Sequence, residues 1–327
     1  MRKKILGIGN ALVDIMTILN DDKLLEKFGL RKGSMQLVDK HFSMHILDLT
    51  NNLIRSQSSG GSAANTINGL ANLGIQTGFI GKIGTDDLGT FFREEMKKHS
   101  IEAILYESSS TSGHAIALVS PDYERTFATY LGAAIELSAD DLNPNIFKEY
   151  EYLHIEGYLV QNHELLEKAL KLAKDNKMIV SLDLASYNIV NENIDFLKSM
   201  IEKYVDIVFA NEEEAKAITG ESPERALDIL VEKTDLAIVK IGKNGSLVKQ
   251  DGKIYKAGII TVNAIDTTGA GDLYAAGFLY GYVNNEPLDK CAMFGAIASG
   301  YVVEVLGAKM ENDRWSRIKE EIENARQ

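Results

Sequence analysis

The sequence predicts an α/β protein in which helices cover both faces of a mostly parallel sheet, with a small second sheet added. Short apolar strands alternate with amphipathic helical stretches along most of the chain, which is the pattern of βα units in a parallel sheet. The 327 residues are 45% hydrophobic, which is enough for one large core. Residues 11–39 and 101–136 interrupt the alternation with shorter strand-like runs.

The main sheet and its helices follow from apolar periodicity and from capping residues. Gly74 closes one amphipathic helix, and Ser222 followed by Pro223 marks the start of another. The expected strands are residues 4–8, 77–83, 152–155, 178–182, 206–209 and 236–241, followed by a hairpin around residues 251–252. The expected helices are residues 60–73, 88–99, 163–175, 194–204, 270–283 and 287–305, with a last helix from about residue 312.

Residues 11–39 and 101–136 are expected to form the second sheet. In the later stretch, the runs 114–119 and 125–130 have strand-like patterns and flank a turn that contains Pro121. We predict antiparallel strands that fold over a ligand site as a lid. No linker-like or low-complexity segment occurs, so we expect a single domain over residues 1–327 into which both lid segments are inserted.

Charge and cysteine content narrow the class of ligand. Lys and Arg total 35, Asp and Glu total 47, and the net charge is −12. This balance argues against a nucleic acid or a membrane surface as a partner, because a protein that binds either of them needs a clustered basic face. No apolar run approaches the ~20 residues of a membrane span. The single cysteine, Cys291, excludes a disulfide framework within the chain, so we expect a cytoplasmic protein with small-molecule ligands.

The segment Asp-Thr-Thr-Gly-Ala-Gly-Asp, from Asp266 to Asp272, stands where an apolar helix begins. Small residues let backbone N–H groups approach an anion, and a helix N-terminus carries about half a positive charge. Asp272 would repel a bound phosphate, but it suits removal of a proton from a hydroxyl that attacks the phosphate. The simpler interpretation is a glycine-rich turn followed by a solvated aspartate.

Other familiar motifs are incomplete. No Gly-x-x-x-x-Gly-Lys-Ser/Thr sequence occurs, so a P-loop is absent. Gly7 and Gly9 resemble the start of a dinucleotide fingerprint, but Leu12 replaces the third glycine, which argues against an NAD-dependent enzyme. His41 and His45 lack the intervening glutamate of a zinc-protease helix, which argues against a zinc site.

A second glycine cluster, Ser-Gly-Gly-Ser-Ala-Ala-Asn at residues 59–65, also precedes a helix. Its glycines permit close backbone approach, and Asn65 offers a donor and an acceptor to a polyol. Together with residues 266–272, it resembles the two signature regions of the ribokinase-like, or PfkB, carbohydrate kinase family. The resemblance covers nearly the whole chain in the right order, and it implies a three-layer α/β/α domain with a small β-sheet lid.

The resemblance implies specific catalytic roles. Asp272 takes the position of the family's base, and the backbone of Gly269, Ala270 and Gly271 takes the position of its anion hole. Arg125 resembles a lid arginine that the mechanism places near the transferring phosphate. The implied activity is ATP-dependent transfer of a phosphoryl group to a hydroxyl.

The resemblance also implies the nucleotide site. Asn211 and Glu214 match an Asn-x-x-Glu motif that organises Mg²⁺ and phosphate through water. Lys240, Gly242 and Gly245 match the nucleotide loop Thr-x-Gly-x-x-Gly, except that Lys240 replaces the threonine. The hydroxyl that the pattern offers to phosphate is therefore missing at this position, whereas a lysine offers a charge to neutralise phosphate. The resemblance allows for a monovalent cation in addition to ATP and Mg²⁺.

The acceptor is expected to be a ribonucleoside, with adenosine converted to AMP, because the pattern around Asp14 looks most like the adenosine kinase branch. Asp14 would occupy the end of the first strand, where the family binds sugar hydroxyls. The alternative acceptor is ribose, fructose or a related sugar. An alternative of another class is a non-catalytic protein that senses a nucleoside or a sugar. We also consider a homodimer formed through the lid. The acceptor-site residues are Asn10, Asp14, Gly60, Gly61, Ser62 and Asn65, and Met35, Gln36, Leu118 and Phe127 are the candidates for contact with a base.

Overall fold

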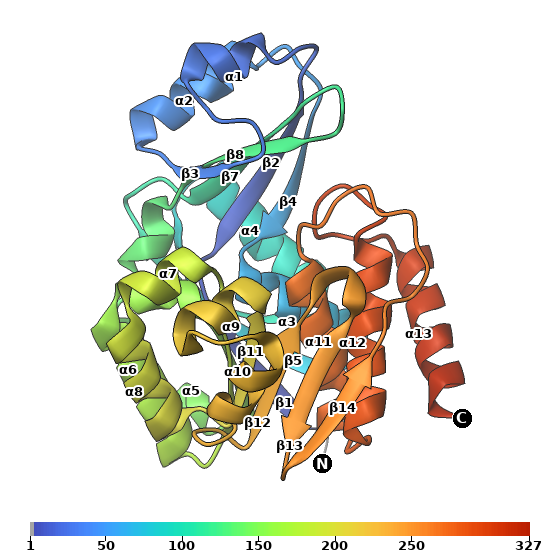
Figure 1. Ribbon diagram of the computed structural model, residues 1–327. Helices are drawn as coiled ribbons and strands as arrows, with labels where there is room; N and C mark the ends of the chain where they lie inside the picture. The colour runs from blue at the N-terminus through green and yellow to red at the C-terminus, as the bar shows by residue number, and fades with distance from the viewer. Residues whose placement is uncertain (1–2) are drawn as a thin grey trace.

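The computed structural model describes residues 3–327 and shows a large α/β/α body with a smaller sheet above it (Figure 1). The large sheet consists of β1 (Lys4–Ile8), β5 (Gln76–Gly84), β6 (Glu102–Ser108), β9 (Tyr152–Glu156), β10 (Ile179–Asp183), β11 (Ile207–Asn211), β12 (Leu236–Lys240), β13 (Ser246–Gln250) and β14 (Lys253–Ala257). Its strand order is β14-β13-β12-β11-β10-β9-β1-β5-β6. All neighbours pair in parallel except the β12–β13–β14 meander at one edge. The carboxyl ends of the seven parallel strands therefore meet at one edge, where ligands bind in open α/β sheets.

Helices cover both faces of this sheet and bury a separate apolar cluster on each (Figure 1). One layer contains α3 (Ser62–Asn72), α4 (Asp87–Lys98), α11 (Ala270–Val283), α12 (Leu288–Val302) and α13 (Asn312–Arg326). The other contains α5 (Pro144–Phe147), α6 (His163–Asp175), α7 (Tyr187–Glu192), α8 (Ile194–Tyr204), α9 (Glu212–Thr219) and α10 (Pro223–Leu230). Within residues 3–327, none of the helices has the length and apolar character needed to cross a membrane.

The predicted strands and helices of the body are confirmed, apart from their boundaries. Gly60 is the last residue of a strand, and the helix expected from residue 60 begins at Ser62. The helix expected over 287–305 ends at Val302. Residues 102–108, expected in the lid, form β6 at the edge of the large sheet, because they pair with β5 in parallel.

The second sheet has five strands in the order β3-β8-β7-β2-β4. They are β2 (Leu12–Ile18), β3 (Met35–Leu37), β4 (Arg55–Gly60), β7 (Gly113–Val119) and β8 (Arg125–Tyr130), and the same region contains α1 (Lys23–Phe28) and α2 (Lys40–Leu49). The predicted antiparallel arrangement is wrong in part, since β2 pairs with β7, and β3 with β8, in parallel. Residues 19–112 separate β2 from β7, and a long crossover of this kind permits parallel pairing. β4, α1 and α2 were not predicted.

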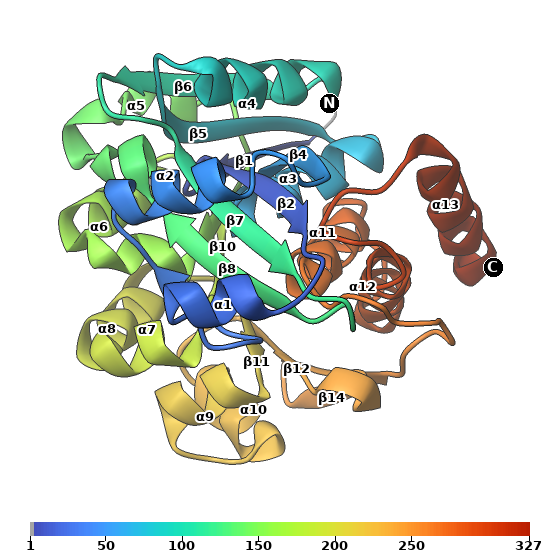
Figure 2. The ribbon, with the colours of Figure 1, turned by 90° about the horizontal axis from the view of Figure 1, so that it is seen from above.

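The two faces of the second sheet differ, and Figure 2 shows α1 and α2 lying over it when the molecule is seen from above. Ile116, Leu118 and Ala128 are fully buried in an apolar cluster with residues of α1 and α2. Gln36 is the register partner of Ala128 and so points to the same covered face. Leu118 and Gln36 are therefore not placed to contact a base, contrary to expectation, because their position in the pleat turns them away from the body. Phe127 lies on the opposite face.

Candidate functional site

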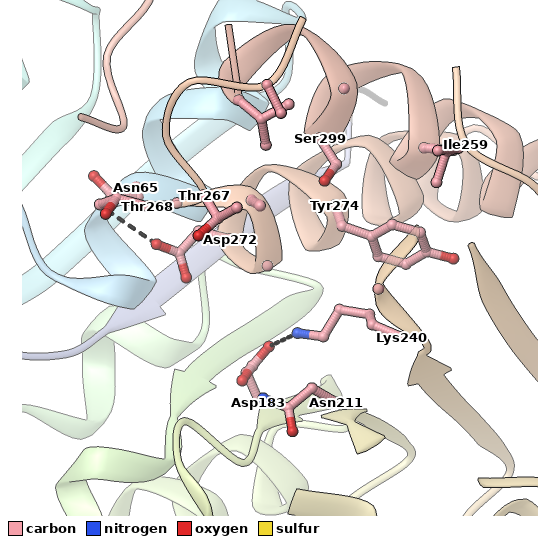
Figure 3. Close-up of a pocket in the computed structure, with 18 of the residues that line it drawn as sticks. Asn65, Asp183, Asn211, Lys240, Ile259, Thr267, Thr268, Asp272, Tyr274 and Ser299 are labelled. Carbon is pink, nitrogen blue, oxygen red and sulfur yellow. Dashed lines mark hydrogen bonds and ion pairs between the residues drawn. The ribbon is translucent and has the colours of Figure 1, made fainter. Parts of the chain in front are cut away.

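A cavity of about 990 Å³ lies at the carboxyl edge of the large sheet, beneath the second sheet. Asp183, Asn211 and Lys240 are the last residues of β10, β11 and β12, and their side chains line it together with the start of α11 (Figure 3). Asp14 on β2 and Phe127 on β8 complete the wall from above. The cavity therefore joins residues from both sheets.

The start of α11 presents free backbone amides to this cavity. Gly269 is the N-cap with φ +75°, a left-handed conformation that glycine adopts without strain. A Cβ atom at Gly269 would also lie 2.5 Å from the Cβ of Ala308. The N–H of Ala270 donates to the carbonyl of Thr267 (3.2 Å), whereas the amides of Gly271 and Asp272 have no backbone partner among residues 3–327. Ala270, one of the three residues expected to form the anion hole, is thus engaged within the turn, whereas the amides of Gly271 and Asp272 are open to an anion at the start of the helix.

The two glycine-rich segments meet at Asp272. Its carboxylate accepts hydrogen bonds from Ser62 Oγ (2.7 Å) and from Asn65 Nδ2 (2.9 Å), as Figure 3 shows for Asn65. Burial raises the pKa of Asp272 to about 6, against the hydrogen bonds from Asn65 and Ser62, which lower it. A carboxylate held in this way suits acceptance of a proton from a bound hydroxyl near neutral pH.

Asp14 reaches the cavity through a gap that a glycine provides. A Cβ atom at Gly60 would lie 2.4 Å from Oδ1 of Asp14, so only glycine leaves room for this carboxylate. Gly61 has φ +99°, and a Cβ there would lie 2.1 Å from the carbonyl oxygen of Asn10. Asp14 lies within β2 rather than at the end of the first strand, β1, as the sequence had suggested. Burial raises its pKa to about 6.

Asn10 does not face the cavity, contrary to expectation. Its backbone N–H and its side-chain amide both donate to Oε1 of Glu156, at 2.9 and 2.8 Å. The other oxygen of Glu156 accepts from the N–H of Ala63 (2.8 Å). Glu156 is fully buried, and burial raises its pKa to about 7. Glu156 was not predicted as a site residue, although a charged residue at the end of an apolar strand is a signal that could have pointed to it.

Lys240 forms a buried ion pair with Asp183, with 2.9 Å between Nζ and Oδ2 (Figure 3). Its Nζ also lies 3.1 Å from the position that a Cβ atom would take on Gly271, so the charge sits beside the amides of α11. Lys240 was predicted from the sequence, whereas Asp183, which likewise ends an apolar strand, was not. The arrangement places a cation at the anion-binding end of the helix.

Asn211 and Glu214 hold each other in a capping box at the start of α9. Asn211 Oδ1 accepts from the N–H of Glu214 (2.9 Å), and Glu214 accepts from the N–H of Asn211 (2.8 Å). Burial, assisted by the charge of Asp183, raises the pKa of Glu214 to about 7. Over residues 3–327, no three His, Cys, Asp or Glu side chains gather as they would around a protein-only metal site. Gly242 and Gly245 line the same end of the cavity.

Arg125 connects the second sheet to the loop that precedes α11. Its guanidinium pairs with the buried carboxylate of Asp266, which also accepts from the N–H groups of Thr268 (2.7 Å) and Gly307 (2.5 Å). Arg125 is absent from the cavity wall, so the expected contact with a transferring phosphate is not made in this arrangement. Met35 is the register partner of Phe127, but it is half exposed and also lies outside the cavity.

Comparison with known proteins agrees with this geometry. Residues 52–314 match the pfkB family carbohydrate kinase model. The crystal structure of adenosine kinase from Sinorhizobium meliloti is 30% identical, with a TM-score of 0.88 over 98% of this chain and 100% of that one. A probable sugar kinase from Rhizobium etli CFN 42 is 28% identical, with a TM-score of 0.89 over 98% of each chain. The 5-dehydro-2-deoxygluconokinase of Clostridium perfringens is 29% identical over 290 residues, which cover 82% of this chain and 85% of the relative.

The family match spans most of the chain, and both glycine-rich signature regions lie within it. The predicted ribokinase-like fold and the predicted class of enzyme are therefore confirmed. The chain belongs to the pfkB family of carbohydrate kinases and is a phosphotransferase that acts on a sugar or a nucleoside.

Proposed function

We propose that this enzyme transfers the γ-phosphoryl group of ATP to the hydroxymethyl group of a ribonucleoside, with adenosine as the acceptor and AMP as the product. One observation carries the proposal. Asp272 lines one cavity together with the hydroxyl-binding groups of Asp14 and Asn65 and with Lys240, and Figure 3 shows Asp272 between Asn65 and Lys240. A hydroxyl between Asp272 and a phosphate at the start of α11 would be placed for in-line transfer.

In the proposed reaction, Asp272 takes the proton of the acceptor hydroxyl as its oxygen forms a bond to the γ-phosphorus. The bond from this phosphorus to the β,γ-bridging oxygen breaks, and ADP leaves with that oxygen. The amides of Gly271 and Asp272 and the ammonium of Lys240 stabilise the negative charge on the transferring group. The base contributes about 10²–10⁴ to the rate, and positioning and electrostatics supply most of the remainder.

The residues at the proposed nucleotide end fit Mg²⁺ bound through water and phosphate, although residues 3–327 by themselves form no cluster of ligands. Mg²⁺ keeps several waters and binds through one or two carboxylates together with substrate phosphates. The carboxylates of Glu214 and Asp183 and the amide of Asn211 all line the nucleotide end of the cavity. We assign Glu214 and Asn211 to this ion through water, and the ion would neutralise phosphate charge during transfer.

The acceptor assignment depends on which groups face the acceptor end. Asn65 Oδ1 is buried without a partner among residues 3–327, so it is available to a ligand hydroxyl. Phe127 adds an aromatic surface for a base. Neither Arg125, which pairs with Asp266, nor Lys309, whose ammonium is buried, lines the cavity. A neutral acceptor therefore suits this end better than a sugar acid or a sugar phosphate.

A coupled ADP-release assay with Mg-ATP tests the acceptor. We expect kcat/KM for adenosine to exceed that for ribose and fructose, since only the nucleoside uses Phe127. The variant Phe127→Ala should lower kcat/KM for adenosine by about tenfold, the scale of one lost stacking contact, and should leave the free sugars nearly unchanged. If ribose or fructose is preferred by tenfold or more, the nucleoside assignment is wrong and the kinase assignment stands.

A further inference from the structure

We propose that Glu156 is a positioning residue of the phosphoryl-transfer site: it fixes the start of α3 and, through it, the side chains that hold the base Asp272. The proposal rests on the proposed function, in which Asp272 accepts the proton of the acceptor hydroxyl. Glu156 does not line the cavity, so it would act without contacting the acceptor or ATP.

The start of α3 lacks a local side-chain cap. Its N-cap residue is Gly61, which has no side chain to accept from the first N–H groups of the helix. Other residues are excluded at this position, since Gly61 has φ +99° and a Cβ atom would lie 2.1 Å from the carbonyl oxygen of Asn10. Because Asn10 approaches so closely, the helix has to obtain its cap from elsewhere in the chain.

Glu156, the last residue of β9, supplies this cap. Its Oε2 accepts from the N–H of Ala63 (2.8 Å), the second residue of α3, which lies 93 positions away in the chain. Its Oε1 accepts from the backbone N–H (2.9 Å) and from the side-chain amide (2.8 Å) of Asn10. All of these groups are donors, which suits a buried carboxylate whose negative charge lies at a helix N-terminus.

These bonds form a junction between the large sheet and the second sheet. Asn10 lies where the chain passes from β1 to β2, and Ala63 follows the passage from β4 to α3. Glu156 therefore joins two of the connections between the sheets, and it does so from β9 in the middle of the large sheet. One of the joined segments continues into the strand that carries Asp14, and the other continues into α3.

The first turns of α3 hold Asp272 at three points. Ser62 Oγ (2.7 Å) and Asn65 Nδ2 (2.9 Å) donate to its carboxylate, and Thr66 Oγ1 donates to its carbonyl oxygen (3.1 Å). Figure 3 shows the bond from Asn65. A displacement of the start of α3 would move these donors together, and small errors in the position of a catalytic group are costly to the rate. Glu156 is thus placed to set the orientation of the base.

The first test compares Glu156→Gln with a matched change at the other end of the same strand. Glutamine keeps the shape of the side chain, but its amide group places donors opposite N–H groups that need an acceptor. We expect Glu156→Gln to lower kcat for adenosine about tenfold and to leave the KM for ATP unchanged, because Asp272 is oriented less well. Glu151→Gln should be neutral, since Glu151 is exposed and accepts from the N–H of Lys4 (2.7 Å), far from the cavity edge. An unchanged kcat in Glu156→Gln, or a rise in the KM for ATP as large as the fall in kcat, would overturn the proposal.

A double-mutant cycle separates positioning from general stabilisation of the fold. Ser62→Ala removes one of the bonds to Asp272, so in that background Glu156→Gln should cost only about threefold in kcat. In the Glu214→Gln background, at the other end of the cavity, Glu156→Gln should keep its full effect of about tenfold. The same loss in both backgrounds would show that Glu156 acts only through stability.

A second variant covers the case in which Glu156→Gln does not fold. When Glu156→Gln is combined with Asn10→Asp, the amide at position 156 can donate to the carboxylate at position 10, and its oxygen can accept from the N–H of Ala63. Only the backbone N–H at position 10 loses its acceptor, so we expect kcat to recover to within about threefold of wild type. A double variant that is no more active than Glu156→Gln contradicts the proposed junction.

The acceptor is tested separately from the role of Glu156. If the wild type phosphorylates ribose or fructose and not adenosine, the proposed acceptor is wrong, and the same losses in kcat are expected with that sugar. If adenosine is phosphorylated but Glu156→Gln turns over like the wild type, the proposed function stands and the role of Glu156 is refuted.

Discussion

The two ends of the cavity differ in how far their polar side chains are paired with other residues of the protein. At the nucleotide end, Lys240 pairs with Asp183 at 2.9 Å, and Glu214 is held by Asn211. At the acceptor end, the amide oxygen of Asn65 has no hydrogen-bond partner within residues 3–327. Buried polar groups are normally paired, so a site with open positions is one that a polar ligand completes. In the proposed function, the side chains of the nucleotide end are thus already paired, whereas the Asn65 oxygen at the acceptor end is open to a ligand.

The two ends also differ in how they are supported. The nucleotide end is built from the ends of neighbouring strands, β10 to β12, in one sheet. The acceptor end combines β2 and β8 of the second sheet with α3 of the body, and the Arg125–Asp266 pair links the two parts. We therefore expect changes at the nucleotide end to alter the rate or the metal requirement, and changes at the acceptor end to alter the acceptor KM.

The largest effect is expected at Asp272, where the two ends meet. Asp272→Asn should lower kcat by at least ~10²-fold with little change in ligand binding, because the base is lost while the shape of the side chain is kept. Steady-state kinetics and calorimetric binding of adenosine measure the two properties. Asp289→Asn, an exposed aspartate in the first turn of α12, is the matched control and should be neutral. Turnover within a few-fold of wild type would remove Asp272 from the base role.

Removal of Asp14 tests the acceptor end by itself. Asp14→Asn should reduce transition-state binding by about 2–4 kcal/mol, since the paired acceptor hydroxyls lose a charged acceptor group. The loss should be seen as a fall in kcat/KM for adenosine, and the KM for ATP should stay near the wild-type value. A larger change in the KM for ATP than in that for adenosine would contradict the separation of the two ends.

The pH dependence of turnover provides a test without any substitution. Burial raises the pKa of Asp272 from 3.8 to about 6, and the base acts in its deprotonated form. We therefore expect kcat to fall as the pH drops through about 6, by about tenfold for each further unit. A kcat that is constant down to about pH 5 would show that this carboxylate is not the titrating base.

The variant Arg125→Met tests the link between the second sheet and the large α/β/α body. Loss of the pair with Asp266 should raise the KM for adenosine by about tenfold, because the second sheet is held less firmly over the acceptor, and kcat should change less. Lys32→Met is the matched control, since Lys32 forms exposed ion pairs with Asp22 and Asp122 in the same sheet region. Equal effects of the two substitutions would remove any special role of the Arg125 pair.

The smallest effect on turnover is expected at the nucleotide end. Glu214→Gln should raise the Mg²⁺ concentration for half-maximal rate several-fold, and the KM for adenosine should be unchanged, because the ion contacts phosphate and not the acceptor. Glu224→Gln, in the first turn of α10, is the control. An unaltered Mg²⁺ requirement would leave Glu214 with only its capping role.

More of the proposed nucleotide end than of the proposed acceptor end could be predicted from the sequence. Residues 266–272, the Asn211–Glu214 pair and Lys240 lie in short motifs at strand ends or helix starts, where local geometry follows from the residues themselves. At the acceptor end, Asp14, Gly60 and Asn65 were also recognised, but Asn10 was assigned to the cavity although Glu156 engages it from 146 residues away.

What the sequence determined by itself was therefore most of the order of strands and helices in the body and the chemistry carried by contiguous motifs. Only the tertiary structure decided that β2 pairs with β7 in parallel, that Gln36 and Leu118 face α1 and α2, and that Arg125 pairs with Asp266. The physical reason is that sheet register and electrostatic compensation depend on distances between distant segments. A shift of one residue turns every side chain of a strand to the other face, and a charge acts on whatever the fold brings near it.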